Sequence, residues 1–167
     1  MVPHKTFTLC GTPEFLAPEV LLGRGYGAAV DWWALGVLVY EIVVGRNPFV
    51  DPFADGGEGA TLRNVLHAPL SFSPRFDPAC RDLIARLLCR FPLQRLGSGV
   101  DGRQQVHDHR FFKRLNMAAL LQQRVPAPWV PPLKDNMDRS HFALQACLLY
   151  TSPSPRDRTR YRMPSSA

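Results

Sequence analysis

Residues 8–19 read TLCGTPEFLAPE, and residues 31–36 a little further along read DWWALG. The first stretch contains the chain breakers Gly11, Pro13 and Pro18, which favour a loop over a regular helix. The second stretch begins a long run of apolar side chains. Together the two stretches predict an irregular segment that is followed by a buried helix.

The predicted helix runs from Ala28 to Val44. Large apolar side chains occur at most of its positions and point in every direction around a period of 3.6 residues, as they do in helices that lack a solvent face. Gly45 and Pro48 follow and are suited to ending a helix. The shorter helices expected downstream cannot cover such a cylinder completely, which indicates further packing partners.

Four shorter helices are expected after this one. Residues 78–89 have apolar side chains at helical spacing, and Asp77 is a suitable N-cap for them. The others are expected at residues 60–67, 104–112 and 116–123. The proline-rich stretch VPAPWVPPL, residues 125–133, is expected to run extended. No segment has the pattern of a strand, so the predicted fold class is mainly α.

Composition excludes several classes of protein. The chain has 167 residues, of which 46% are hydrophobic, and this is enough for one domain with its own core. No signal peptide is found, and the longest apolar run is interrupted by Glu41 and falls short of the roughly 20 residues that span a bilayer. A soluble cytoplasmic protein without a membrane span is therefore expected. Half of the net charge of +6 lies in residues 147–167, so nucleic acid is not an expected partner.

Cysteine and histidine give no metal site. Cys10, Cys80, Cys89 and Cys147 form no C-x-x-C pair, and free thiols in a reducing compartment are preferred over disulfides or zinc. The pair His107 and His109 could bind a metal only with further ligands, which the sequence does not offer. A polar surface turn is the preferred interpretation of these two histidines.

The last residues, 147–167, differ in composition from the rest. They begin CLLYTSPSPRD, are rich in Ser, Pro and Arg, and have the composition of a disordered segment. A phosphorylatable regulatory tail is one interpretation. The preferred one is that CLLYTSPSPRD and the final RMPSSA resemble the translation of a sequencing adapter and its primer, so that the natural sequence ends near Ala146.

The motifs resemble those of the AGC group of serine/threonine protein kinases. TLCGTPEFLAPE is similar to the end of the activation segment, and DWWALG is similar to the start of the central helix of the C-terminal lobe. Arg95-Leu96-Gly97, Phe111-Phe112, VPPL and DRSHF follow in the order of this group. The resemblance implies an incomplete helical kinase lobe in residues 1–112, the start of the AGC C-terminal tail in residues 113–146, and the adapter-like segment in residues 147–167.

The resemblance also implies roles in substrate binding and regulation. Thr8 corresponds to the residue that an upstream kinase phosphorylates, and Lys5 could pair with that phosphate. Leu9, Pro13 and Leu16 correspond to the apolar pocket for the residue after the phosphoacceptor of a protein substrate. Glu41 corresponds to a carboxylate that attracts basic residues before the phosphoacceptor. The alternative for Thr8 is a solvated hydroxyl, and for Glu41 a helix carboxylate with a local partner. The three apolar residues could instead be ordinary loop residues that pack against other parts of the protein.

Four further residues are implied to support the kinase architecture. Thr12 corresponds to the partner of the catalytic aspartate, and Asp31 to the carboxylate that caps the catalytic loop. The alternative for Asp31 is that it only favours the start of its own helix. Glu19 and Arg95 correspond to a buried ion pair, in which removal of one partner costs about 3–5 kcal/mol. Phe15 departs from the group pattern, because close relatives often have Tyr there.

The implied activity is phosphorylation of Ser or Thr in proteins, near basic residues, with ATP and Mg²⁺ as cofactors. The sequence has no G-x-G-x-x-G, V-A-I-K, H-R-D or D-F-G motif, and these supply the ATP site and the catalytic residues of protein kinases. The chain is therefore expected to be an inactive fragment that has no catalytic residue and binds neither ATP nor a metal. The alternative is a natural, non-catalytic docking or decoy module.

Overall fold

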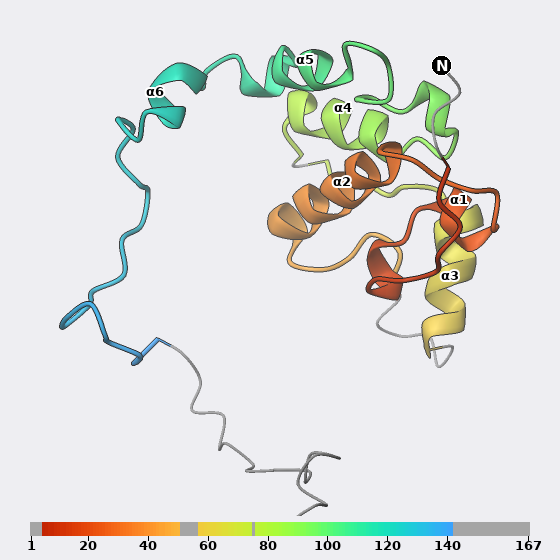
Figure 1. Cartoon of the computed structure of the whole chain (residues 1–167), viewed down its shortest axis with the longest axis horizontal. Coiled ribbons are helices and arrows are strands. Elements are labelled where there is room, and N and C mark those ends of the chain that lie inside the picture. The colour runs from red at the N-terminus through yellow and green to blue at the C-terminus, as the bar shows by residue number, and fades with distance from the viewer. Residues whose placement is uncertain (1–4, 51–56, 75, 142–167) are drawn as a thin grey trace, which may run out of the picture. The chain divides into compact units, whose positions relative to one another are not determined.

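A computed structural model of the chain describes residues 5–50, 57–74 and 76–141, and the regular secondary structure of these residues is helical (Figure 1). The chain divides between Arg124 and Val125 into two units. The described residues contain no strand beyond one isolated antiparallel bridge between Thr6 and Tyr26. The predicted mainly helical fold class is thereby confirmed.

The segment before the central helix is not a continuous loop. It contains the 3-10 helix η1 (Pro13–Phe15) and the short helix α1 (Pro18–Leu21). Both prolines were expected to act only as breakers, yet each begins a helical turn. Proline suits that position because its ring has a helical φ and its missing N–H is not needed in the first turn.

The central helix α2 (Ala29–Val44) begins one residue later than predicted and ends where expected. Gly45 ends it with φ 80°, a left-handed conformation that glycine adopts without strain. Gly36 lies where α2 approaches the C-terminal end of helix α4 (Pro78–Leu87), since a Cβ built on it would be 2.9 Å from side-chain atoms of Leu87 and Leu88. A side chain at Gly36 would therefore push the two helices apart.

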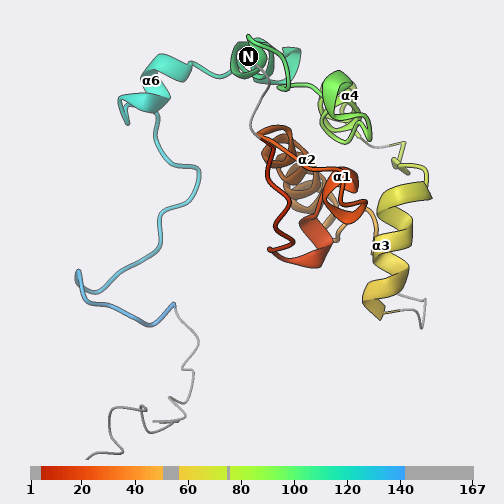
Figure 2. The ribbon, with the colours of Figure 1, turned by 45° about the vertical axis from the view of Figure 1, so that its right-hand side comes forward.

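Helices α3 (Gly57–His67) and α4 (Pro78–Leu87) follow. Helix α3 begins earlier than the predicted residue 60, and α4 ends before the predicted residue 89. Asp77 caps α4 as expected, because its carboxylate accepts hydrogen bonds of 2.9 Å from the backbone N–H groups of Ala79 and Cys80. Figures 1 and 2 show α4 beside α2, and α3 beside η1 and α1.

The helix predicted at residues 104–112 is wrong in its extent. The structure has α5 (Gly102–His107) and then the 3-10 helix η3 (Arg110–Phe112), with His109 extended between them. The Nδ1 atom of His109 accepts the backbone N–H of Phe111 at 3.3 Å, which starts the new turn. Helix α6 (Met117–Leu121) is shorter than the predicted 116–123, because Asn116 is its cap and not its first residue.

Two groups of apolar side chains form the core of the first unit. The larger group joins α2 to α3 and α4 and includes Trp33, Val37, Tyr40, Val65 and Ile84. The smaller group, Leu83, Leu87 and Val106, joins α4 to α5.

Part of α2 stays uncovered by the described residues. Leu38, Ile42 and Val43 are 45%, 74% and 52% exposed. The prediction that the shorter helices would not cover α2 completely is thereby confirmed.

The described part of the second unit, residues 125–141, has neither helix nor strand. It contains the proline-rich stretch 125–133, which was predicted to run extended. The ring of Trp129 packs edge-on against that of His141, and the Nε2 atom of His141 is 3.1 Å from the carbonyl oxygen of Pro132. The carboxylate of Asp138 accepts the backbone N–H groups of Lys134 and Ser140. These contacts fold the segment back on itself.

Among the described cysteines, Cys10, Cys80 and Cys89 are free thiols, as expected. Cys147 and the adapter-like segment 147–167 lie outside the described residues. No helix in the described part of the chain is long and apolar enough to cross a membrane.

Candidate functional site

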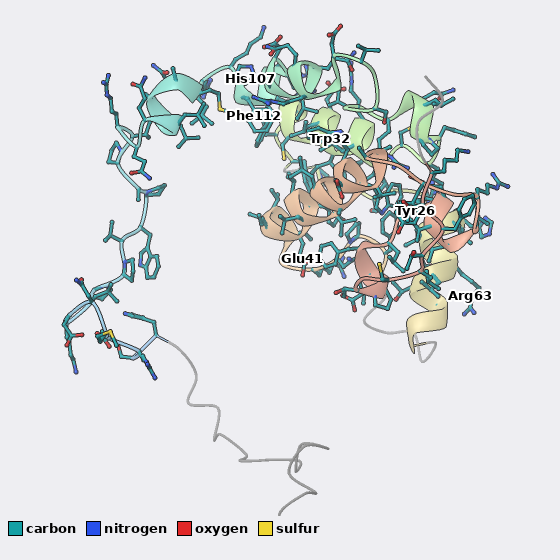
Figure 3. All side chains as sticks on the ribbon, viewed as in Figure 1. Tyr26, Trp32, Glu41, Arg63, His107 and Phe112 are labelled. Carbon is teal, nitrogen blue, oxygen red and sulfur yellow. The ribbon has the colours of Figure 1, made fainter. Side chains whose placement is uncertain are left out.

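The segment that carries Thr8 is fastened to the turn after α1. The backbone N–H of Thr6 donates to the carbonyl of Tyr26, and the N–H of Tyr26 donates back to the carbonyl of Thr6, both at 2.9 Å. The Tyr26 hydroxyl then donates to the carbonyl of Thr8 at 2.8 Å. Figure 3 shows the position of Tyr26 in this part of the molecule. The Thr8 side chain itself stays exposed.

The Tyr26 hydroxyl is a dependable donor at neutral pH. Loss of hydration and the neighbouring Cys10 side chain both raise the pKa of Tyr26 above its ordinary value. The phenol therefore keeps its proton over the physiological range. Nothing in the motif around Thr8 points to Tyr26, and the sequence analysis did not select it.

The three apolar residues expected to receive a substrate side chain lie around η1. Leu9 is 69% exposed, whereas Pro13 and Leu16 are half-buried. Leu16 lies against Gly11, because a Cβ on Gly11 would be 3.5 Å from its Cδ2 atom. Neither described core group includes any of these three residues, so they remain at the surface.

A buried asparagine that the sequence analysis missed holds η1 in place. Asn47 donates from its Nδ2 atom to the carbonyl of Glu14 at 3.1 Å and accepts the backbone N–H of Phe49 at 2.9 Å. Asn64 of α3 in turn donates to the carbonyl of Phe49 at 2.9 Å. This chain of hydrogen bonds connects η1 to α3 through the loop after α2. The only sequence signal was the turn-forming pair Asn47-Pro48.

Glu19 and Arg95 form a buried, bidentate ion pair. The Nη1 and Nη2 atoms of Arg95 donate to Oε1 and Oε2 of Glu19 at 2.7 and 2.9 Å. Arg95 also donates to the carbonyls of Ala29 and Cys89, and its guanidinium lies 5.2 Å from the centre of the Trp33 ring. Such planar pairs are stronger and more specific than single contacts. The pair joins α1 to the start of α2 and to the segment after α4.

The remaining predicted residues are exposed or half-exposed. Thr12 is exposed, and its backbone carbonyl accepts the N–H of Phe15 at 3.0 Å. Asp31 lies exposed in the first turn of α2. Glu41 is half-buried near the C-terminal end of α2 (Figure 3). Within the described residues, the carboxylates of Asp31 and Glu41 have no ion-pair partner.

The structure corrects the interpretation of His107 and His109 as one polar surface turn. His107 is exposed and lies 2.9 Å from the carboxylate of Asp108. His109 is buried, and its Nε2 atom is 3.0 Å from Oδ2 of Asp82 on α4. Among the described residues, no group of three or more His, Cys, Asp or Glu side chains could hold a metal ion.

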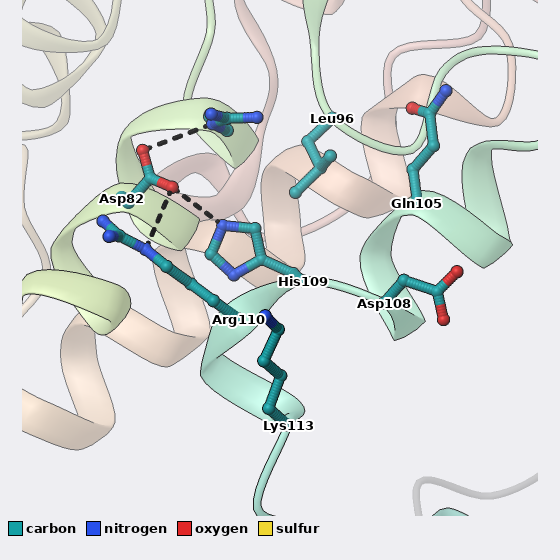
Figure 4. A pocket seen from close by; sticks show the side chains of 8 residues that line it. Asp82, Leu96, Gln105, Asp108, His109, Arg110 and Lys113 are labelled. Carbon is teal, nitrogen blue, oxygen red and sulfur yellow. Dashed lines mark hydrogen bonds and ion pairs between the residues drawn. The ribbon is translucent and has the colours of Figure 1, made fainter.

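Asp82 is the centre of a charged hollow between α4, α5 and η3 (Figure 4). Partial burial acts to raise the pKa of Asp82, but the hydrogen bond from His109 and the charges of Arg86 and Arg110 outweigh it and hold the pKa below its ordinary value.

The hollow measures about 720 Å³ and has Leu96 as its apolar wall. None of the residues that line it is a glycine, so it lacks the glycine-rich loop that holds the phosphates of ATP in protein kinases.

Comparison with known proteins decides the family. The sequence-family model described as the protein kinase domain matches residues 2–112. The chain belongs to the protein kinase domain family. Its relatives are kinases of the AGC group, as the activation-segment motif predicted.

Three relatives illustrate the similarity. Ribosomal protein S6 kinase alpha-4 of Homo sapiens is 39% identical over 153 residues, which are 91% of this chain and 20% of the relative. The cAMP-dependent protein kinase catalytic subunit of Dictyostelium discoideum is 41% identical over 143 residues, 86% of this chain and 22% of the relative.

The third, cAMP-dependent protein kinase type 3 of Saccharomyces cerevisiae, is 38% identical over 142 residues, 84% of this chain and 35% of the relative. The chain thus spans between about a fifth and a third of the length of these relatives.

Proposed function

We propose that this chain forms the substrate-facing helical lobe of a protein serine/threonine kinase that transfers the γ-phosphoryl group of ATP to proteins. The observation that carries the proposal is the anchoring of TLCGTPEFLAPE: its last residue, Glu19, is held by the buried guanidinium of Arg95. This anchor, and the bond from Asn47 to Glu14, fix a surface segment relative to α2. A fixed surface segment is what ordered binding of a substrate peptide requires.

The proposed substrates have an apolar residue after the phosphoacceptor and basic residues before it. The exposed Leu9 and the half-buried Pro13 and Leu16 offer apolar surface for the first. The carboxylate of Glu41, which has no cationic partner among the described residues, supports the second. Opposite charges brought together at such a site favour binding and speed association.

Three exposed side chains have roles in regulation and support within this proposal. Thr8 is the proposed acceptor of phosphate from an upstream kinase, and its exposure makes the hydroxyl accessible. Thr12 and Asp31 are proposed to hydrogen-bond the catalytic loop of a complete kinase, and both are exposed. A phosphate on Thr8 would add about −1.5 to −2 charges beside the exposed Lys5.

The chain by itself is proposed to be inactive. ATP and Mg²⁺ belong to the chemistry of the complete enzyme, and the sequence has none of the four motifs that hold them in protein kinases. Free thiols at Cys10, Cys80 and Cys89 support a reducing compartment, so a cytoplasmic location is part of the same proposal.

Incubation of the purified chain with radiolabelled ATP, Mg²⁺ and a basic serine peptide tests this inactivity. We expect no transfer of phosphate to the peptide above the background without protein. The full-length Dictyostelium relative serves as the positive control. Turnover that depends on the chain and persists after removal of contaminating kinases would contradict the proposal.

A second candidate is a non-catalytic docking or decoy module. The uncovered apolar side chains of α2, Leu38, Ile42 and Val43, favour it, because exposed apolar patches often bind other polypeptides. A natural transcript that encodes only this lobe would support this candidate over the first.

A further inference from the structure

We propose that Tyr26 is a positioning residue for Thr8, and that a tether made by Gly25 and Tyr26 must open before the Thr8 hydroxyl can accept phosphate. The tether is defined as the contacts of residues 25–26 with residues 5–8. The proposal rests on the proposed role of Thr8 as a phosphorylation site. It adds a residue outside the TLCGTPEFLAPE motif that controls access to that site.

The hydrogen bonds of the tether occupy the backbone on both sides of Phe7. Both backbone groups of Thr6 are bound to Tyr26, and the Thr8 carbonyl is bound to the Tyr26 hydroxyl. The bond to Thr8 is the only one of these that a side chain makes. Replacement of that side chain therefore weakens the tether without any change in the main chain.

Gly25 allows the close approach of the two segments. A Cβ built on Gly25 would lie 2.8 Å from two ring carbons of Phe7 and 3.1 Å from Cδ of Lys5. The residue also has φ +70°, where side chains are strained. The side chains of Lys5 and Phe7 thus cover the bare backbone of Gly25, and any larger residue there would displace them.

The tether competes with enzymes that act on Thr8. Enzymes that bind a substrate segment in extended form commonly use its backbone N–H and carbonyl groups, and here both groups of Thr6 and the carbonyl of Thr8 are occupied. In the transfer step the Thr8 Oγ atom forms a bond to the γ-phosphorus of ATP. The bond from that phosphorus to the bridging oxygen breaks, ADP leaves, and the hydroxyl proton is released. The exposed hydroxyl is ready for this step, but its backbone must first be detached.

Limited cleavage by trypsin after Lys5 measures the opening of the tether in the full chain. The rate of such cleavage follows the population of the open form when opening is fast. Tyr26→Phe removes the hydroxyl alone, and we expect cleavage after Lys5 to become about two- to tenfold faster, as the loss of one net hydrogen bond predicts. Hydrogen exchange of the Thr6 and Tyr26 amides should become faster by a similar factor.

Tyr40→Phe is the matched control. The Tyr40 hydroxyl also donates to a backbone carbonyl, that of Ser71 at 2.9 Å, but it lies in the core between α2 and the segment before α4. We expect this variant to leave cleavage after Lys5 unchanged. Unchanged cleavage in Tyr26→Phe, or an equal increase in Tyr40→Phe, would overturn the proposal.

A pair of glycine variants tests the same tether independently. Gly25→Ala should accelerate cleavage after Lys5 more than Tyr26→Phe does, because the new methyl group meets the Phe7 ring. Gly23→Ala is its control, since Gly23 also has a positive φ, +61°, but open space around it. Equal acceleration by both alanines would mean that backbone strain, and not the contact with Phe7, opens the segment, and would contradict the role of Gly25.

A phosphorylation measurement separates this proposal from the proposed function. The probe is a purified serine/threonine kinase chosen because it phosphorylates a synthetic peptide of residues 4–16 at Thr8. We expect Thr8 to be phosphorylated more slowly in the chain than in that peptide. The Tyr26→Phe variant should be phosphorylated at a rate between the two. If trypsin shows the tether but its opening leaves Thr8 phosphorylation unchanged, the control over Thr8 is refuted while the kinase-lobe function stands.

Discussion

Arg95 shows how one side chain can connect stretches that lie far apart in the sequence. Its guanidinium binds both oxygens of Glu19 and the carbonyls of Ala29 and Cys89, and it lies over the Trp33 ring. Because both side chains are buried, loss of either one would leave the charge of the other without its partner. The end of TLCGTPEFLAPE, at Glu19, is thus anchored by a residue that follows α4 in the sequence.

Glu19→Gln tests this anchor at the scale of one residue. The amide keeps the shape of the side chain but leaves the Arg95 charge buried and unpaired, so we expect the free energy of unfolding to fall by about 3–5 kcal/mol. Urea denaturation measures the change.

Arg86→Gln is the control, because Arg86 pairs with Asp82 at the surface and is 60% exposed. Exposed pairs contribute roughly 0–1 kcal/mol. Equal losses of unfolding free energy in the two variants would contradict the larger stabilisation expected from the buried pair.

Sequence reasoning at this scale succeeded where a motif fixed the partners and failed where single polar residues act alone. Glu19 and Arg95 were paired in advance because the family resemblance links them. Asn47, Tyr26 and His109 make equally specific contacts, but their partners are backbone groups or residues far along the chain. No period or spacing in the sequence marks such contacts.

The joint between α4 and η3 shows how elements are held together by a polar cluster. Asp82 of α4 faces His109 and Arg110, which precede and begin η3. His109 also starts η3 by accepting the N–H of Phe111. His109 therefore both starts η3 and ties it to α4.

The pH dependence of stability tests this joint. The pKa of Asp82 is lower in the folded chain than in the unfolded chain, where about 3.9 is normal. Its stabilising contribution is therefore complete above the unfolded pKa and is lost as the pH falls through the folded pKa. We expect the difference in unfolding free energy between the wild type and Asp82→Asn to shrink from about pH 5 to about pH 2.

Urea denaturation of both proteins across this range is the measurement. A difference that stays constant with pH would show that the charge of Asp82 does not stabilise the joint. Asp108, whose pKa is also lowered by His107 and Gln104, is unchanged in both proteins and cancels in the comparison.

The helices were predictable in proportion to the strength of their local signals. The continuous apolar run before Gly45 located α2 to within one residue at its start, and Asp77 located the start of α4. The run at 104–112 was mistaken for one helix because the break at His109 depends on a contact with α4. The short turns η1 and α1, which begin at proline, were predicted as loop for the same reason: the sequence does not show their contacts with other elements.

At the scale of the whole molecule, the sequence predicted the family and the helical class, and the structure adds which surfaces are available. The apolar face of α2 and the anchored stretch around η1 are both at the surface of the first unit. A lobe of this kind has surfaces for binding but none of the motifs that hold ATP. The proposed function, a substrate-facing part of a kinase, therefore requires an ATP site that the motifs of this chain do not supply.

Sequencing of the natural transcript in both directions from the region that encodes TLCGTPEFLAPE tests this central claim most directly. We expect an upstream sequence with a glycine-rich loop, a strand lysine, H-R-D and D-F-G, and the absence of the residues now numbered 147–167. A transcript that begins at Met1 and keeps those residues would contradict the proposed role in a catalytic kinase and favour the docking module.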